Sequence, residues 1–228
     1  MTELNNQLHR IIDNINLAEN QAGIALNSVQ LLAVSKTQPP EIIRQAAMEG
    51  QRYFGENYLQ EALVKINSLN DLKLEWHFIG PIQSNKTKDI AENFAWVQTI
   101  DRLKIAQRLN NQRPSHLGKL NVCIQVNIDN ESTKSGIEAT ELFKLAEHIS
   151  QLNNLQLRGL MIIPAPSNDL VQQQDSFKQA HSLFKQLADI YPSVDTLSMG
   201  MSGDMAIAIA EGSTMVRIGT ALFGVRQA

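Results

Sequence analysis

The sequence predicts a single-domain (β/α)8 barrel of the TIM type with an extra N-terminal helix. Eight short apolar runs alternate along the chain with segments of helical periodicity, which is the pattern of parallel βα units. Several runs, such as Val122 to Ile128, are continuously hydrophobic, as expected for strands buried on both faces of a sheet. A doubly wound open sheet is the alternative, but eight units within 228 residues and the lack of a Gly-x-Gly-x-x-Gly motif after the first strand favour the closed barrel.

The first twenty residues predict an amphipathic helix that precedes every strand. Leu4, Leu8, Ile11, Ile12 and Ile15 recur at steps of three and four residues, so they share one helix face. We expect this helix to cover one side of the barrel with that face.

After it, strands and helices are expected to alternate to the end of the chain. The expected strands cover residues 30–35, 52–55, 74–79, 95–99, 120–128, 157–163, 195–198 and 215–223. The expected helices cover residues 41–48, 57–69, 85–93, 101–110, 138–152, 169–190 and 203–211. The first of them has Pro40 near its start and Gly50 just past its end, which is the usual punctuation of a helix.

Composition excludes several classes of function. No break in composition marks a second domain, so residues 1–228 are expected to form one domain, and we expect a monomer. The 20 basic and 23 acidic residues give a net charge of -3, which offers no overall attraction for nucleic acid or an anionic membrane. No stretch reaches the roughly 20 apolar residues of a membrane span, and the N-terminus carries no basic leader. A cytoplasmic protein is therefore expected.

The single cysteine and the absence of metal-ligand spacing narrow the chemistry further. Cys123 is the only cysteine, which excludes an intramolecular disulfide and a thiolate zinc cluster and is in keeping with a reducing compartment. Because it stands inside an apolar run, it is interpreted as a small core residue rather than a reactive thiol. No metal site is predicted.

Lys36 is the first candidate functional residue. It follows Leu32 and Val34 in the same alternation phase, which aims its amine into the barrel at the carboxyl end of the first strand. That end is the catalytic end of such barrels. A desolvated amine has a lowered pKa and can attack an aldehyde to give a Schiff base. The alternative is a solvated lysine that has already turned into the following loop.

A candidate anion cradle comes from the last two βα connections. Ser202 is a possible N-cap of the helix expected at 203–211, where unpaired N–H groups would meet a phosphate. Period-two alternation places Arg217 and Gly219 on one face, and Gly219 lets an anion approach the main chain while Thr220 adds donors. Barrel phosphate sites are typically built from the loops after strands seven and eight. The alternatives are an ordinary capped helix and an arginine paired with a buried acid.

Weaker candidates lie between these two regions. Asn57 follows the second strand and is either a hydrogen-bond partner for a ring oxygen or a helix cap. Met161, at the end of the sixth strand, would offer an apolar wall to a flat ring. His77 lies in a buried run and is interpreted as a core histidine bonded to the backbone rather than a base. Lys134 is a possible second reactive amine, although a solvent-facing lysine is the simpler interpretation.

Six segments taken together resemble the pyridoxal phosphate homeostasis protein family, the single-domain relatives of the alanine racemase barrel. They span nearly the whole chain in one order, and their order makes the set far more specific than any one motif. The segments are Leu32-Ala-Val-Ser-Lys36, Phe54-Gly-Glu-Asn57-Tyr58, Trp76-His-Phe-Ile-Gly-Pro-Ile-Gln83 with Asn85-Lys86, Lys134-Ser-Gly136, Ser198-Met-Gly-Met-Ser202 and Gly212-Ser-Thr-Met-Val-Arg-Ile-Gly-Thr220.

The resemblance implies that Lys36 carries pyridoxal 5′-phosphate as a Schiff base. It also implies that Ser202, Gly219 and Thr220 hold the phosphate and that Arg217 meets the pyridine nitrogen. An arginine donor keeps that nitrogen unprotonated, which makes the ring a weaker electron sink.

The expected function is therefore a non-enzymatic binding protein that holds pyridoxal phosphate and exchanges it with apo-enzymes or free amines. Racemisation would need a second acid or base on the face opposite Lys36, and resembling racemases supply a tyrosine there from an added domain and a partner subunit. Tyr58 is the nearest substitute in the sequence. The alternatives are a weak amino-acid racemase and a Schiff-base aldolase acting on a sugar phosphate.

Overall fold

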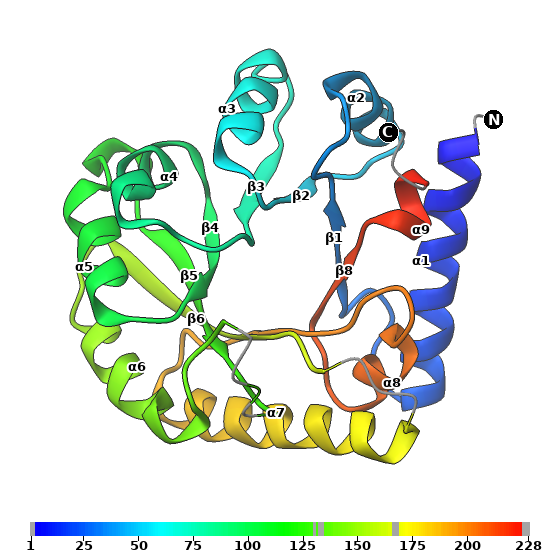
Figure 1. Ribbon diagram of the computed structural model, residues 1–228. Helices are drawn as coiled ribbons and strands as arrows, with labels where there is room; N and C mark the ends of the chain where they lie inside the picture. Colours follow the sequence, from blue (N-terminus) through cyan, green and yellow to red (C-terminus); the bar gives the residue numbers. More distant parts are fainter. Residues whose placement is uncertain (1–2, 130, 132–134, 166–168, 225–228) are drawn as a thin grey trace.

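The computed structural model describes residues 3–129, 131, 135–165 and 169–224, and it has a closed barrel of parallel strands (Figure 1). The strands follow one another around the barrel in chain order, and β1 closes the ring against β8. They are β1 (Gln30–Val34), β2 (Tyr53–Glu56), β3 (Glu75–Phe78), β4 (Trp96–Ile100), β5 (Leu120–Val126), β6 (Leu155–Ile162), β7 (Thr196–Ser198) and β8 (Met215–Ile218). The predicted (β/α)8 barrel is confirmed, and the open sheet is excluded.

Helices fill the connections and surround the sheet (Figure 1). They are α1 (Glu3–Ala22), α2 (Pro40–Met48), α3 (Leu59–Ser68), α4 (Thr87–Asn93), α5 (Leu103–Gln112), α6 (Leu142–Ser150), α7 (Leu170–Ile190), α8 (Met205–Ala210) and α9 (Thr220–Phe223), with short 3-10 turns η1 (Ser84–Lys86), η2 (Ser115–Leu117) and η3 (Ala139–Glu141). The expected helices agree with these to within a few residues at their ends.

The last strand is shorter than the sequence pattern indicates. The apolar run at 215–223 predicts one strand, but β8 stops at Ile218 and Gly219 caps the short helix α9. An apolar run does not distinguish a buried strand from a buried helix. Here the run contains both, and the change of direction at Gly219 places Thr220 beside the open end of the barrel.

The N-terminal helix completes the outer ring of helices. Helix α9 has only four residues, too few to cover the groove between β8 and β1. Helix α1 instead packs against α8, α9 and α2 (Figure 1). Its buried face carries Leu4, Leu8, Ile11 and Ile15, which confirms the predicted role of the apolar stripe for these four residues. Ile12, which was expected on the same face, is exposed.

The two faces of the sheet differ in polarity. The large apolar core lies between the strands and the helices and includes Leu31, Ala33 and Val216. The interior of the barrel holds two small apolar clusters, Leu32 with Ile79 and Met215, and Trp96 with Cys123 and Met161, each packed against partly buried neighbours. The remaining interior volume is occupied by buried polar side chains, and these position the site described next.

Two absences can be stated for the described residues. No helix among them is long and apolar enough to cross a membrane. No group of three or more histidine, cysteine, aspartate or glutamate side chains within the described ranges is arranged to hold a metal ion.

Candidate functional site

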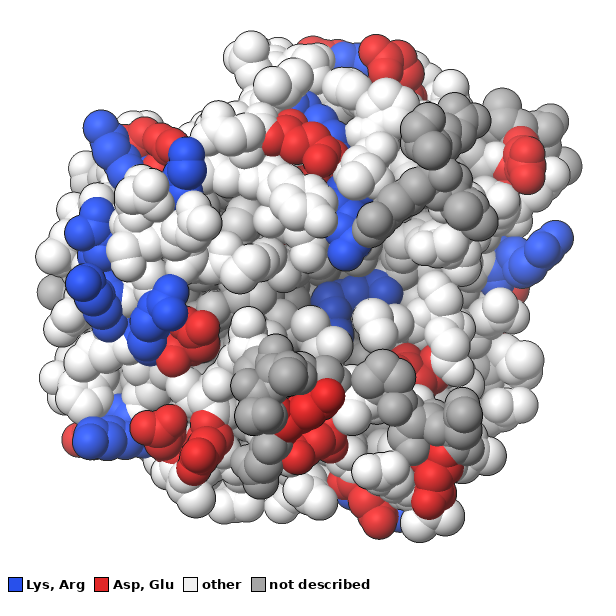
Figure 2. Space-filling view, viewed as in Figure 1, with Lys and Arg blue, Asp and Glu red and all other residues white. Residues whose placement is uncertain are grey.

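A cavity of about 360 Å³ opens at the carboxyl ends of the strands. Lysine and arginine side chains lie in the hollow near the centre of this face (Figure 2). All seven predicted site residues line the cavity, namely Lys36, Asn57, Met161, Ser202, Arg217, Gly219 and Thr220. The other lining residues are Val34, Ile79, Ile163, Met201 and Gly203. The structure thus brings together residues that are up to 184 positions apart in the sequence, from Lys36 to Thr220 (220 − 36).

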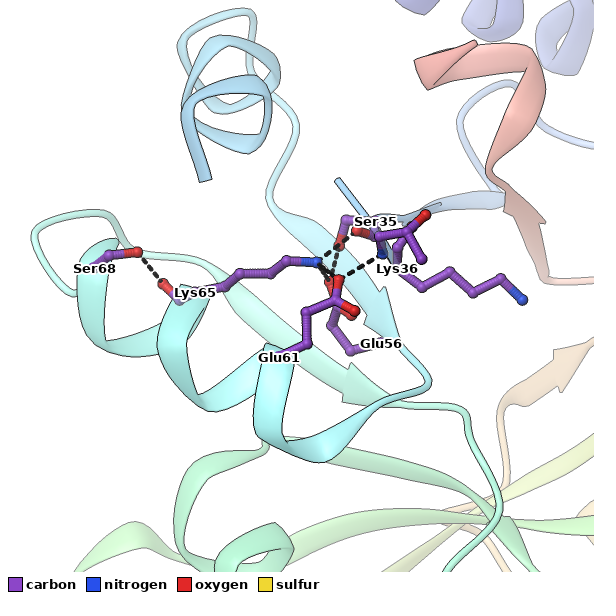
Figure 3. A network of polar contacts seen from close by, with 7 residues as sticks. Ser35, Lys36, Glu56, Glu61, Lys65 and Ser68 are labelled. Carbon is purple, nitrogen blue, oxygen red and sulfur yellow. Dashed lines mark hydrogen bonds and ion pairs between the residues drawn. The ribbon is translucent and has the colours of Figure 1, made fainter. Parts of the chain in front are cut away.

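Lys36 is half-buried and leaves β1 in the phase that the sequence predicts. Leu32 and Val34 face the barrel interior with it, whereas Ser35 points the other way, toward β2 and α3. Figure 3 shows the Lys36 side chain extending away from the polar cluster beneath it. The amine is therefore directed into the cavity rather than engaged by the protein's own carboxylates.

That polar cluster fixes the two residues on either side of Lys36 (Figure 3). The Lys65 ammonium donates to the Ser35 carbonyl at 2.7 Å and to Glu56 Oε1 at 2.7 Å, and it also contacts Glu61. Glu61 in turn accepts from the Thr37 N–H, and the Ser35 hydroxyl donates to Glu56 at 2.7 Å. The Lys65 ammonium therefore holds the backbone before Lys36 directly, at Ser35, and the backbone after it through Glu61, at Thr37.

The electrostatics of the cluster are those of a buried ion pair. Glu56 is fully buried, and Lys65 is 2 % exposed. Burial raises the pKa of Glu56, and the hydrogen bonds from Lys65 and Ser35 oppose that rise. Because a buried charge without a partner is costly, each of the two ions stabilises the other.

Arg217 points into the barrel and has no carboxylate partner among the described residues. One guanidinium nitrogen donates to Ser198 Oγ at 2.9 Å and the other to the Ile162 carbonyl at 2.8 Å. Burial lowers the pKa of Arg217 to about 10, partly offset by the charge of Asp204, so the group is still protonated at neutral pH. The alternative prediction, that this arginine is paired with a buried acid, is wrong in its direct form.

The expected phosphate-binding residues come together from two connections. Ser202 lies in the loop after β7, and Gly219 and Thr220 lie at the turn from β8 into α9. A Cβ at position 219 would lie 3.3 Å from the Val34 carbonyl oxygen. Glycine at this position therefore lets the turn after β8 pass close to the end of β1. Thr220 begins α9, where backbone N–H groups have no partner within the helix.

The local role expected of Ser202 needs correction. Helix α8 begins at Met205, and its N-cap is Asp204 rather than Ser202. The Asp204 carboxylate accepts from the backbone N–H of Met201, which closes the loop by a short-range turn of the kind that aspartate favours. Ser202 is therefore exposed on that loop instead of capping a helix.

Asn57 is seated by a close approach of two chain segments. A Cβ on Gly80 would lie only 2.1 Å from the Asn57 carbonyl oxygen, so only glycine fits after β3. The cap of α3 is Tyr58, so the alternative that Asn57 caps this helix is wrong. The Asn57 side-chain oxygen is buried without a hydrogen-bond partner among the described residues. An orphaned buried acceptor of this kind points to a ligand donor.

The remaining sequence candidates fall outside the cavity. Cys123 is fully buried beside Trp96 and Met161, and burial raises the pKa of its thiol, which confirms a core role. Tyr58 is 52 % exposed and lines a neighbouring pocket that shares only Asn57 with this one. Lys134 lies outside the described residues.

His77 is a core residue, as expected, but its partners are side chains rather than backbone. It stacks on Trp96 with ring centroids 5.0 Å apart and contacts Gln98 and Glu75 through its two ring nitrogens. Burial lowers the pKa of His77 despite the opposing effect of Glu75. It is neutral at pH 7.

Sequence reasoning missed four polar residues that support the site. Glu56 and Lys65 hold the backbone around Lys36, and Gln98 and Ser198 lie behind Arg217. The available signal was a polar amide inside a largely apolar strand, as with Gln98 in the segment Trp96-Val-Gln-Thr-Ile100. No comparable signal distinguishes Lys65 from a surface lysine on an amphipathic helix.

Comparison with known sequences shows a match to one family model and to relatives that share one name. The family model described as alanine racemase, N-terminal domain, matches residues 7–227. A pyridoxal phosphate homeostasis protein of Pasteurella multocida is 56% identical over 223 residues, which is 96% of each chain. The protein of the same name from Escherichia coli K12 is 52% identical over 229 residues, covering 99% of this chain and 98% of the other.

Solved structures agree with the fold. PipY of Synechococcus elongatus PCC7942 with pyridoxal phosphate bound is 38% identical, covers 92% of this chain and 98% of its own, and superposes with a TM-score of 0.78. An alanine racemase of Clostridium difficile 630 in complex with cycloserine has a TM-score of 0.71 at 16% identity, covering 95% of this chain but 60% of its own. This last likeness concerns the barrel alone.

Proposed function

We propose that this chain, which belongs to the pyridoxal phosphate homeostasis proteins within the family of alanine racemase N-terminal domains, holds pyridoxal 5′-phosphate for intracellular homeostasis, bound to Lys36 as a Schiff base. The observation that carries the proposal is the convergence on one cavity of Lys36 and Arg217, neither of which has a carboxylate partner within the described part of the chain, with the predicted phosphate-binding residues Ser202, Gly219 and Thr220. The named relatives and the bound cofactor in PipY support it.

The lining residues fit the parts of this ligand one by one. The Lys36 amine would condense with the aldehyde, forming a carbon–nitrogen double bond and releasing water. Ser202, Gly219 and Thr220 would hold the phosphate, and Arg217 would donate to the pyridine nitrogen. The unpartnered Asn57 side chain offers polar contact to the ring substituents, and Met161 provides an apolar wall.

The same residues favour storage over turnover. When bound, pyridoxal phosphate supplies a reactive aldehyde and an electron-accepting ring. An arginine donor leaves the ring nitrogen unprotonated, so the ring accepts electrons less strongly. Among the described residues that line the cavity, none is a tyrosine, histidine, cysteine or carboxylic acid. Loss of a positioned second acid or base costs on the order of 10²–10⁴-fold in rate.

We therefore infer a carrier without robust catalytic turnover. Residues 1–228 would act as one binding domain, working as a monomer in the cytoplasm. Sequestering the aldehyde on Lys36 limits its reaction with other amines and keeps it transferable to apo-enzymes, since an incoming amine would displace Lys36 from the imine carbon, forming a new imine and freeing the lysine amine.

A spectroscopic titration tests the covalent link. We expect addition of pyridoxal phosphate to the purified protein to produce the visible absorption of an imine. Borohydride reduction should then add the cofactor mass to the peptide that contains Lys36. In Lys36→Ala the imine should disappear while phosphate-dependent affinity persists, because Ser202, Gly219 and Thr220 act independently of the covalent bond. A reduced adduct on another peptide, with Lys36 unmodified, would overturn the assignment.

A turnover assay separates the carrier from a weak racemase. The loaded protein is incubated with L- and D-alanine, and the enantiomer ratio is followed over time. We expect binding without rapid racemisation. Rapid racemisation would reject the carrier, and a bound sugar phosphate with no imine would favour the aldolase alternative.

A further inference from the structure

The barrel interior contains a continuous chain of side-chain hydrogen bonds that starts at Arg217. Arg217 donates to Ser198 Oγ at 2.9 Å, and Ser198 Oγ donates to Gln98 Oε1 at 2.7 Å. The Gln98 amide nitrogen lies 2.9 Å from His77 Nδ1, and His77 Nε2 lies 3.3 Å from Glu75 Oε1. These residues come from β8, β7, β4 and β3, so the chain crosses the barrel.

The chemistry of the two ends sets the direction of every bond. A guanidinium can only donate, and a carboxylate can only accept. The Ser198 hydroxyl must then donate a hydrogen bond to the side-chain oxygen of Gln98. The side-chain nitrogen of Gln98 in turn donates to His77. His77 must accept at Nδ1 and carry its proton on Nε2. The opposite amide orientation would leave a bare imidazole nitrogen facing the Glu75 carboxylate.

Burial makes this arrangement consequential. His77, Gln98 and Ser198 are fully buried, and Arg217 is 5 % exposed, whereas the Glu75 side chain is 40 % exposed. Arg217 therefore carries a buried charge with no carboxylate beside it. Hydrogen bonds in a low-dielectric interior polarise one another along a chain. Aligned donors running from the cation to Glu75 would disperse that charge toward the opposite end of the barrel.

We infer that Ser198, Gln98, His77 and Glu75 are positioning residues for Arg217 and hold its guanidinium as a fixed donor toward a ring nitrogen in the cavity. The inference rests on the proposed function for the identity of the ligand. It also gives a reason why Arg217 has no ion pair with a carboxylate of the described residues. A carboxylate in direct contact would occupy the guanidinium donors, whereas a chain of neutral groups orients them and leaves the cavity side free.

The first test needs no cofactor. Nitrogen-15 NMR of the labelled, cofactor-free protein should show His77 protonated at Nε2 and bare at Nδ1. In Gln98→Leu the Nδ1 resonance should move, because its donor is lost. A proton on Nδ1 in the native protein would reverse the chain and overturn the inference.

The second test compares two buried serines. Ser198→Ala removes the link between Arg217 and Gln98. Ser213→Ala is the matched control, because Ser213 is 2 % exposed and its hydroxyl lies, among the described residues, within hydrogen-bond distance of backbone carbonyls only, at 2.7 Å from that of Met199. We expect Ser198→Ala to weaken pyridoxal phosphate binding about tenfold, as for loss of one bond to a charged group. It should also shift the absorption maximum of the bound cofactor, whereas Ser213→Ala should leave that maximum unchanged.

Glu75→Gln tests action at a distance, because Glu75 does not line the cavity. We expect a smaller absorption shift in the same direction as that of Ser198→Ala. Unchanged maxima in Ser198→Ala and Glu75→Gln, or an equal shift in Ser213→Ala, would overturn the inference while the native imine still forms. Failure of the native protein to form any imine would instead reject the proposed function, and the NMR result would stand independently.

Discussion

Lys65 and Arg217 are both buried cations, one behind Lys36 and the other lining the cavity, yet the protein compensates their charges differently. Lys65 contacts the carboxylates of Glu56 and Glu61 directly and donates to the Ser35 carbonyl. Among the described residues, Arg217 has only a hydroxyl and a carbonyl as hydrogen-bond partners. The difference indicates that the Lys65 charge stabilises the fold, because its hydrogens are already engaged by carboxylates. The Arg217 charge is available to a ligand in the cavity.

The sharpest way to break this comparison is Lys65→Met. The substitution leaves the buried Glu56 without its cation, and removing one partner of a buried ion pair costs about 3–5 kcal/mol. We expect that decrease in the free energy of unfolding, measured by urea denaturation. The double variant Lys65→Met with Glu56→Gln should recover part of it. A loss below about 1 kcal/mol in Lys65→Met would show that the pair is not a stabilising element.

The pH dependence of stability tests the hydrogen-bond chain behind Arg217, because His77 belongs to that chain. His77 has a lowered pKa because it is buried, so below the ordinary value of about 6.5 the unfolded chain binds a proton that the folded chain does not. His77 therefore leaves the free energy of unfolding unchanged above that pH and lowers it as the pH falls further. We expect a slope of about 1.4 kcal/mol per pH unit, beginning near pH 6.5.

The control for this slope is His77→Gln. Denaturation of both proteins between about pH 6.5 and pH 5 should show a slope smaller by one proton in the variant. Identical slopes would mean that His77 takes up a proton in the folded protein, which is incompatible with its role as a neutral member of the interior chain.

Arg217→Met should affect the ligand far more than the fold. No buried carboxylate among the described residues loses a direct partner, so we expect the free energy of unfolding to change by less than about 2 kcal/mol, the cost of leaving Ser198 and a carbonyl less well bonded. The absorption of bound pyridoxal phosphate should shift. A destabilisation as large as that of Lys65→Met, with an unchanged spectrum, would make the two cations equivalent.

Glu61→Gln should give the smallest effect. The carboxamide keeps an acceptor for the Thr37 N–H while it removes one of the two charges beside Lys65. Glu61 is 31% exposed, so solvent screens the lost charge, and we expect a decrease in stability of about 1 kcal/mol or less. The rate of imine formation at Lys36, followed by stopped-flow absorption, should change little. A loss comparable to that of Lys65→Met would place the compensating charge on Glu61 instead of Glu56.

The extent of the prediction from sequence differs between fold and site. The alternation of apolar runs and helical segments predicted every strand, because parallel strands buried on both faces leave a strong local pattern. The boundary at Gly219 was wrong because an apolar run is compatible with either element. All seven predicted site residues line the cavity, since the topology of a barrel gathers the segments that follow its strands at one rim.

The sequence by itself determined the barrel, the inward phase of Lys36 and the rim on which the candidate site lies, because each depends on periodicity over a few neighbouring residues. Only the tertiary structure decided which polar groups compensate the buried charges. The bond from Ser198 to Gln98 joins residues 100 positions apart, and that from Lys65 to Ser35 joins residues 30 apart. Such partners are chosen by distance and hydrogen-bond direction in the folded chain, which no local pattern contains.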